Sequence, residues 1–129
     1  MLAIHPASQK AEALDVVSLL QDLMSCEAAC VICADACLSE SDVQELAACI
    51  SLNNECADVC SATARVVARV GHQQSAVTGM LLETCREACR MCAEECEKHD
   101  HEHCTLCAES CRRCELACEQ TVGHMMALV

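Results

Sequence analysis

Sixteen cysteines stand among the 129 residues, most of them three or four positions apart. The stretch CEAACVICADAC, Cys26 to Cys37, shows the pattern, with four cysteines at intervals of four, three and four residues and nothing between them that would bend the chain. In a helix these intervals place all four thiols in a stripe about 60° wide on one face. Because thiolates bind soft metal ions, the spacing predicts a helix face that can hold metal.

Three more segments carry the same stripe. One repeats the intervals in the forward direction, and two give them when read backwards, as antiparallel packing requires, with Asn53 taking the place of one cysteine. The first two stripes are Cys26, Cys30, Cys33 and Cys37, and Cys85, Cys89, Cys92 and Cys96; the reversed ones are Cys60, Cys56, Asn53 and Cys49, and Cys118, Cys114, Cys111, Cys107 and Cys104.

Four helices are needed to position these stripes. With one proline and three glycines, and with many Ala, Leu, Glu, Gln and Arg, the composition favours helix. We expect helices from about Ser8 to Leu38, from a capping box at Ser41 and Gln44 to about Val70 with Gly71 as its cap, from the GHQQS loop to about Lys98, and from a cap at Asp100 to Gly123–Met126. Such lengths and short loops predict an all-α protein, an antiparallel up-down-up-down four-helix bundle. We expect one domain over residues 1–129, with 1–8 and 124–129 as loose ends.

In that bundle the stripes stack into layers around the axis. The expected layers are Cys26, Cys60, Cys85 and Cys118; Cys30, Cys56, Cys89 and Cys114; Cys33, Asn53, Cys92 and Cys111; and Cys37, Cys49, Cys96 and Cys107. The sequence therefore predicts a column of sulfur along the axis.

Explanations without metal fit less well. A core that used cysteine only as a small apolar side chain would be under-filled. Cysteines four apart on one helix form poor disulfides because their Cβ vectors are nearly parallel, although disulfides between helices remain open. A thioredoxin-type enzyme needs a CxxC beside a βαβ unit, and no strand pattern accompanies the CxxC pairs here.

Among metals, the pattern favours Cu(I). Zinc prefers closed sites of four ligands, and iron–sulfur ligands usually stand in loops. Cu(I) accepts two or three thiolates, so each CxxxC pair could clamp one ion, and bridging thiolates would raise the capacity to on the order of one Cu(I) per cysteine. Neither an open coordination position nor a substrate pocket is evident, so we expect storage or buffering and no enzyme activity. A general thiolate buffer for zinc or cadmium is the alternative, and an iron–sulfur electron carrier is a weaker one.

Charge and composition limit the partners and the compartment. The net charge of −12 argues against nucleic acid and anionic membrane as partners. MLAIHPASQK has no export signal, and no run approaches the roughly 20 apolar residues of a membrane span. We therefore expect a cytoplasmic protein, in which thiols stay reduced.

The two ends of the bundle are expected to differ. One is an apolar plug formed by Leu19, Leu23, Val66, Val67, Leu82 and Val122 or Thr121. At the other end stands HDHEHC, with His99, His101, His103 and Cys104, near Glu40 and Leu46. Imidazole can pass Cu(I) to thiolate, so this end is the expected mouth, with His99 and His103 as ligands and His101 at the point of uptake. Met24, Met80, Met125 and Met126 lie toward the plugged end, where we expect core packing more than copper binding.

The stretches CEAACVICADAC, CISLNNECADVCSATARV, CREACRMCAEECEKH and HEHCTLCAESCRRCELACE closely resemble the bacterial copper storage proteins, over about residues 10 to 122. The absence of a leader makes the chain similar to the cytosolic branch, whose members are homotetramers of four-helix bundles that bind many Cu(I) ions inside each bundle. The resemblance implies no enzyme activity, extends to the sixteen cysteines and the three histidines, and includes the polar gap at Asn53. The C-terminal GHMMALV departs from it.

Overall fold

Four long helices make up most of the protein. The computed structural model describes residues 1–6, 10–69 and 75–127, and the side chains within these ranges except those of 10–14 and 126–127. The helices are α1 (Lys10–Leu38), α2 (Ala47–Val67), α3 (Ala76–Cys96) and α4 (Glu102–Ala127), with short 3-10 helices η1 (Leu2–Ile4) and η2 (Val43–Leu46). No strand occurs in the described ranges, so the all-α prediction is confirmed.

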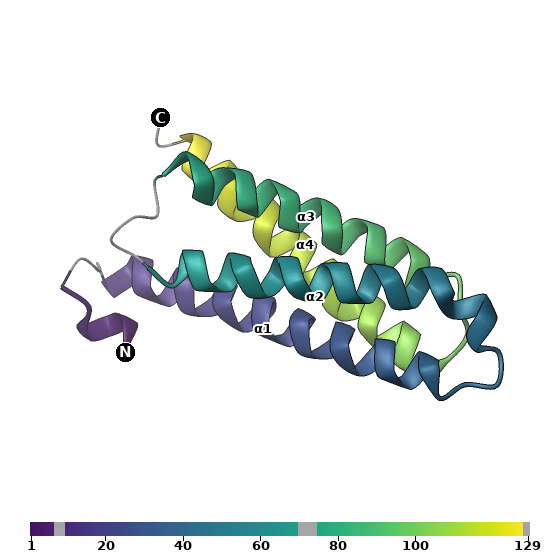
Figure 1. Cartoon of the computed structure of the whole chain (residues 1–129). Coiled ribbons are helices and arrows are strands. Elements are labelled where there is room, and N and C mark those ends of the chain that lie inside the picture. The colour runs from purple at the N-terminus through teal and green to yellow at the C-terminus, as the bar shows by residue number, and fades with distance from the viewer. Residues whose placement is uncertain (7–9, 70–74, 128–129) are drawn as a thin grey trace.

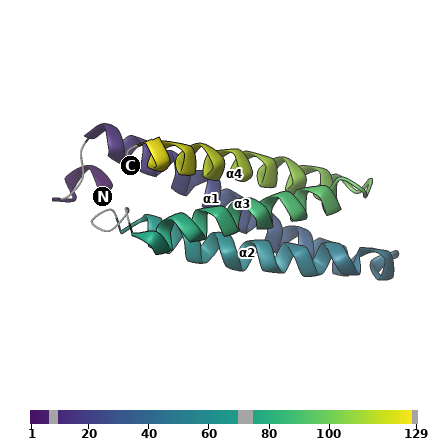
Figure 2. The same ribbon diagram turned by 90° about the horizontal axis from the view of Figure 1, so that it is seen from above.

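The helices run antiparallel around one axis. The α1–α2 and α3–α4 connections lie at the same end of the bundle, and both termini lie at the other (Figure 1). Viewed from above, each helix packs beside the next in the order α1, α2, α3, α4, and α4 returns to α1 (Figure 2). The predicted up-down-up-down bundle is therefore confirmed.

Several predicted helix ends need correction. The capping box at Ser41 and Gln44 is wrong, because η2 precedes α2 and has Asp42 at its N-cap, without a capping side chain. At the start of α3, the Ser75 side chain accepts a hydrogen bond from the Thr78 amide. His101, rather than Asp100, the expected cap, directly precedes α4. The expected ends near Ser8, Val70 and Gly71 lie outside the described residues.

The helices approach closely because their buried faces carry small side chains. Buried alanines accompany the cysteines, among them Ala57, Ala64, Ala93 and Ala108. Neighbouring sulfurs lie 3.5 to 4.0 Å apart along the axis, which brings them into van der Waals contact. The bundle thus has a packed interior made of thiols and methyl groups.

The expectation that no run of the chain is long and apolar enough to span a membrane needs correction for α1. By length and composition alone, Asp15–Leu38 is apolar enough to span a membrane, with a mean hydropathy of 1.6. A core helix of a soluble protein meets the same criterion. Here one face of α1 carries four buried cysteines and faces the bundle axis, and only a third of the apolar window is buried.

Candidate metal site: a column of thiols

All sixteen cysteines are free thiols that line the bundle axis, and each is between 0% and 1% exposed. They come from all four helices, because the four-three-four spacing keeps every stripe on the inner face of its helix. The prediction that the thiols face one another is confirmed.

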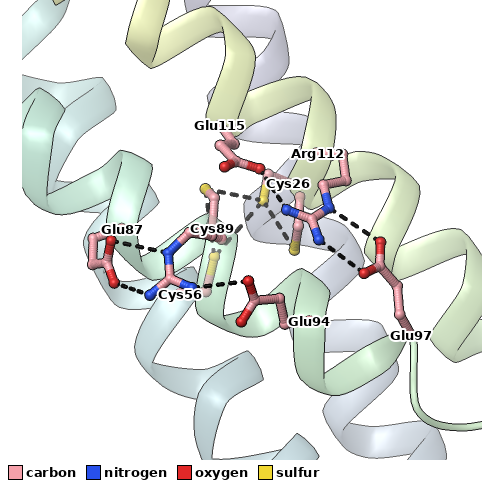
Figure 3. Close-up of polar contacts among 10 residues, drawn as sticks. Cys26, Cys56, Glu87, Cys89, Glu94, Glu97, Arg112 and Glu115 are labelled. Atoms are coloured by element: carbon pink, nitrogen blue, oxygen red, sulfur yellow. Dashed lines mark hydrogen bonds and ion pairs between the residues drawn. The ribbon is translucent and has the colours of Figure 1, made fainter.

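The column is narrow enough for one sulfur to touch three other helices. Cys26 on α1 lies 3.8 Å from Cys56 on α2, 3.9 Å from Cys89 on α3 and 3.7 Å from Cys111 on α4. Figure 3 shows Cys26, Cys56 and Cys89 behind the ion pairs of the outer surface, where Arg112 pairs with Glu97, the residue that follows α3. Since a metal–thiolate bond is about 2.3 Å long, sulfurs this close can share one ion.

The predicted layers hold between α2 and α3. The sulfur of Cys60 lies 3.8 Å from that of Cys85, and the sulfur of Cys49 lies 3.5 Å from that of Cys96. Cys56 likewise meets Cys89 at 3.7 Å.

The predicted position of α1 in these layers is only partly right. Toward α2 it holds, because Cys26 lies within 4.8 Å of Cys60 as expected. Toward α3 it is wrong by one cysteine, because Cys26 contacts Cys89 in place of Cys85. Toward α4 it is wrong by two cysteines, because Cys26 contacts Cys111 in place of Cys118.

Asn53 fills the gap in the α2 stripe and is fully buried. Its side-chain oxygen accepts hydrogen bonds from Cys92 at 3.0 Å and from Cys107 at 3.2 Å, and its amide donates to Cys49 at 3.6 Å. These bonds satisfy the amide in a place where an unpaired polar group would be costly. Asn53 therefore orients thiols from three helices.

The thiols form overlapping sets of four. In each set all sulfurs lie within 4.8 Å of one another. Three such sets are Cys26, Cys56, Cys60 and Cys89; Cys26, Cys30, Cys56 and Cys111; and Cys30, Cys92, Cys107 and Cys111. Because successive sets share members, the column is continuous and does not divide into separate cages. Shared thiolates suit Cu(I), which accepts two or three sulfurs, better than zinc, which prefers four of its own.

At the end that carries the helix connections, one histidine joins the thiols. His103 forms a set with Cys33, Cys37 and Cys104, again within 4.8 Å. Its Nδ1 lies 3.4 Å from the Cys33 sulfur and 3.6 Å from the Cys104 sulfur, while its Nε2 lies 2.8 Å from Glu40. A mixed nitrogen and sulfur set thus stands at the head of the column.

The other two histidines have carboxylate partners. His101 stacks on His103 with ring centroids 5.3 Å apart, and its two nitrogens face Glu40 at 3.1 Å and Asp42 at 3.0 Å. His99, which follows α3, pairs at 2.9 Å with Glu95 in the last turn of that helix. The sequence analysis placed Glu40 near this end but missed its partnership with the histidines, and it missed Asp42. The facing segments SESD and HDHEH, acidic and histidine-rich, are the signal that could have revealed both.

The thiols at this end differ in acidity. A hydrogen bond with Cys107 raises the pKa of Cys33, but hydrogen bonds with Cys49, Cys96 and His103 outweigh it and lower the pKa to about 6. Burial raises the pKa of Cys37 to about 12. Cys33 is therefore the thiol in this set that ionises most easily, and it lies against His103.

Burial lowers the pKa of His103, but hydrogen bonds with Cys33 and Glu40 outweigh that effect, so its pKa is raised above the ordinary value. The hydrogen bond with His101 lowers the pKa of Asp42, which keeps that carboxyl ionised. The end of the column thus carries negative charge around its histidines, which attracts cations.

The opposite end is closed by apolar side chains, as predicted. Leu23 is 0% exposed, Leu82 1% and Val67 2%, and Leu19 is also buried. Thr63 and Thr78 are buried there too, a feature that the sequence analysis did not include.

The expectation of core packing by the methionines is wrong for two of them. Met24 is 61% exposed and Met80 69% exposed. Met125 is partly buried against the core, and the side chain of Met126 lies outside the described residues. The GHMMALV segment is helical as far as Ala127.

Known proteins share this arrangement. The profile of the family described as "Copper storage protein" matches residues 12–123. The structure of Ccsp, the copper storage protein of Streptomyces lividans loaded with 10 copper equivalents, is 40% identical, with a TM-score of 0.86 over 95% of each chain. A second structure of it, with five coppers, is described as cytosolic and is 42% identical, with a TM-score of 0.80 over 84% of this chain and 92% of the other.

Two Bacillus subtilis matches agree with the family profile. Cu(I)-bound BsCsp3 is 32% identical, with a TM-score of 0.72 over 82% of this chain and 96% of the other. The cysteine-rich protein YhjQ, described as uncharacterized, is 34% identical over 77% of this chain and 88% of its own length. The chain therefore belongs to the copper storage protein family.

Proposed function

We propose that the protein stores Cu(I) in its thiol column, with all sixteen cysteines as ligands. The observation that carries this proposal is that neighbouring sets of four sulfurs have members in common. A sulfur that bridges two ions serves both, so a column of bridging sulfurs holds more ions than separate sites when each ion needs only two or three sulfurs. Closed sets of four would use up sixteen thiols in about four zinc ions. Bridged Cu(I) reaches on the order of one ion per thiol.

Related structures support the choice of metal. Ccsp was loaded with 10 copper equivalents, and BsCsp3 is described as Cu(I)-bound. We propose no enzyme activity, because burial leaves these thiols no room for a substrate. We also propose that residues 1–129 act as one copper-binding domain in the cytoplasm, which the description of Ccsp as cytosolic supports.

An anaerobic titration tests the storage function. Reduced protein would be titrated with Cu(I), and separately with Zn(II), each against a competing chelator of known affinity. We expect ten or more tightly held Cu(I) per chain, and fewer, weaker Zn(II). Equal or tighter binding of zinc would favour the general thiolate buffer, and a brown product after exposure to iron and sulfide would favour an iron–sulfur carrier.

We further propose that copper enters at the end formed by His103, Cys33, Cys37 and Cys104. Of the three thiols in this set, Cys33 has the lowest pKa, and it lies beside a ring nitrogen of His103. Carboxylate side chains surround the set. We include His99 as a ligand and His101 as a residue of the uptake path; in the copper-free protein both rings contact carboxylates.

We also propose that the protein assembles with copies of itself, as a homotetramer by resemblance. Val17, Met24, Val31 and Leu38 recur every seven residues on the outer face of α1, and they are 38%, 61%, 53% and 62% exposed. A heptad stripe of this kind is typical of helix pairing. Two antiparallel copies would pair Val17 with Leu38 and Met24 with Val31, which makes the stripe complementary to itself.

The assembly can be measured by analytical ultracentrifugation. We expect the double substitution Met24→Glu and Val31→Glu to reduce the mass toward that of one chain. Leu116→Glu, which changes another exposed apolar residue on α4, is the control and should leave the mass unchanged. A wild-type protein that sediments as one chain would contradict the proposal.

A further inference from the structure

Glu40 connects the two helix junctions at the mouth. It lies two residues after the end of α1, while its partner His101 directly precedes α4 and His103 lies in the first turn of that helix. One of its oxygens, Oε2, lies 2.8 Å from Nε2 of His103 and 3.1 Å from Nδ1 of His101. The carboxylate is therefore shared between two stacked rings.

The contact with Glu40 decides which nitrogen of His103 carries the proton. A carboxylate only accepts hydrogen bonds, so Nε2 of His103 must be the donor. In a neutral imidazole the other nitrogen, Nδ1, then has a free lone pair. This is the nitrogen that lies 3.4 Å from the Cys33 sulfur and 3.6 Å from the Cys104 sulfur.

Its surroundings hold Glu40 in this position. Nδ1 of His101 lies 3.1 Å from its Oε2, while Nε2 of His101 forms hydrogen bonds of 3.0 Å and 3.1 Å with the two oxygens of Asp42. The rings of His101 and His103 stack with an angle of 4° between their planes. A carboxylate that faces both of these stacked rings cannot easily turn away from His103.

We propose that Glu40 is a positioning residue for copper uptake, which fixes His103 with its Nδ1 lone pair directed at the thiols of Cys33 and Cys104. In the opposite tautomer an N–H group would face these thiols, and the ring could not bind Cu(I) at that side. Carboxylate partners of this kind orient metal-binding histidines and make them more basic. The inference rests on the proposed storage function and on the proposed mouth.

Stopped-flow loading tests the role of Glu40. Apo-protein would be mixed anaerobically with a Cu(I)–chelator complex, and copper–thiolate absorption would be followed in the near ultraviolet, where the chain has no Trp or Tyr. We expect Glu40→Ala to slow the first equivalents about tenfold, the lower end of the effect of losing such a partner. The control Asp42→Ala, which removes a carboxylate from His101 alone, should load within about twofold of wild type.

Two further measurements separate positioning from a general effect. At a pH above the raised pKa of His103, where the ring is neutral, nuclear magnetic resonance of isotope-labelled histidine should show the Nε2–H tautomer of His103 in wild-type apo-protein and a mixture in Glu40→Ala. The double variant Glu40→Ala with His103→Ala should load no more slowly than His103→Ala alone, because Glu40 acts through that ring. Additive slowing, an unchanged tautomer, or equal slowing by Asp42→Ala would overturn the proposal.

The total copper capacity distinguishes this inference from the storage function. Glu40→Ala should bind as many Cu(I) ions as wild type, because the thiols remain. Normal capacity with a normal loading rate in Glu40→Ala would refute only the role of Glu40. Low capacity in the wild-type protein would refute storage itself.

Discussion

The apolar plug should carry much of the stability of the copper-free protein. Leu82 on α3 is 1% exposed and packs in the same core as Leu23 and Val67. Replacing it with alanine removes buried methyl groups and leaves a cavity, which costs about 2 to 5 kcal/mol. Against a total stability of about 5 to 15 kcal/mol, this is a large fraction.

Denaturation of the reduced apo-protein measures this effect. With urea slopes of about 1 to 3 kcal/mol per molar, a loss of that size moves the midpoint down by about 0.7 to 5 M. Helix content by circular dichroism is the suitable signal, because the chain has no Trp, Tyr or Phe. All samples need the same protein concentration, since assembly would make the midpoint depend on it.

The matched control is Met80→Ala, two residues earlier on α3 and 69% exposed, which should change stability by no more than about 0.5 kcal/mol. Copper capacity should be unchanged in both variants, because neither residue belongs to the column. If Leu82→Ala loses less than about 1 kcal/mol, or no more than Met80→Ala, the plug does not stabilise the bundle as argued here.

Three other outcomes are expected. Circular dichroism of copper-free protein should already show a largely helical chain, because thiols in contact fill the core without metal; a random coil that folds only with Cu(I) would contradict this. Replacing His99 and His103 with alanine should slow loading and removal of copper in stopped-flow experiments, with capacity nearly unchanged; slowing by Met24→Ala or Met80→Ala instead would place the mouth at the plugged end. Asn53→Cys should add a thiol to the gap and raise the capacity by about one Cu(I) in the same titration, following the ratio of one ion per thiol; an unchanged capacity would show that Asn53 is not part of the ligand column.

The sequence predicts the thiol column well because one strong periodicity decides it. Four-three-four spacing keeps a residue on one helix face whatever the neighbouring helix does, so the burial of Cys26 or Cys118 follows from spacing alone. The scarcity of glycine and proline then leaves few places for the chain to turn, which determines the number of helices.

The spacing of the cysteines does not predict how far each helix is shifted along its neighbours. This shift differs from one pair of helices to the next, by one cysteine between α1 and α3 and by two between α1 and α4, and the spacing of cysteines along each helix does not encode it. Likewise, the partnership of Glu40 with His103 joins residues 63 positions apart, and only the packed structure brings them together.

The closed plug has a consequence for the order in which stored ions turn over. With copper passing only through the end at His103, as proposed, ions loaded first must lie deepest, beside Leu23 and Leu82, and ions loaded last must leave first. The store then behaves as a stack, in which old copper is exchanged slowly while recent copper is exchanged quickly. Loading with one stable copper isotope and then the other, followed by partial removal with a chelator, should release mainly the second isotope; release of both in proportion to their amounts would show that ions mix freely along the column.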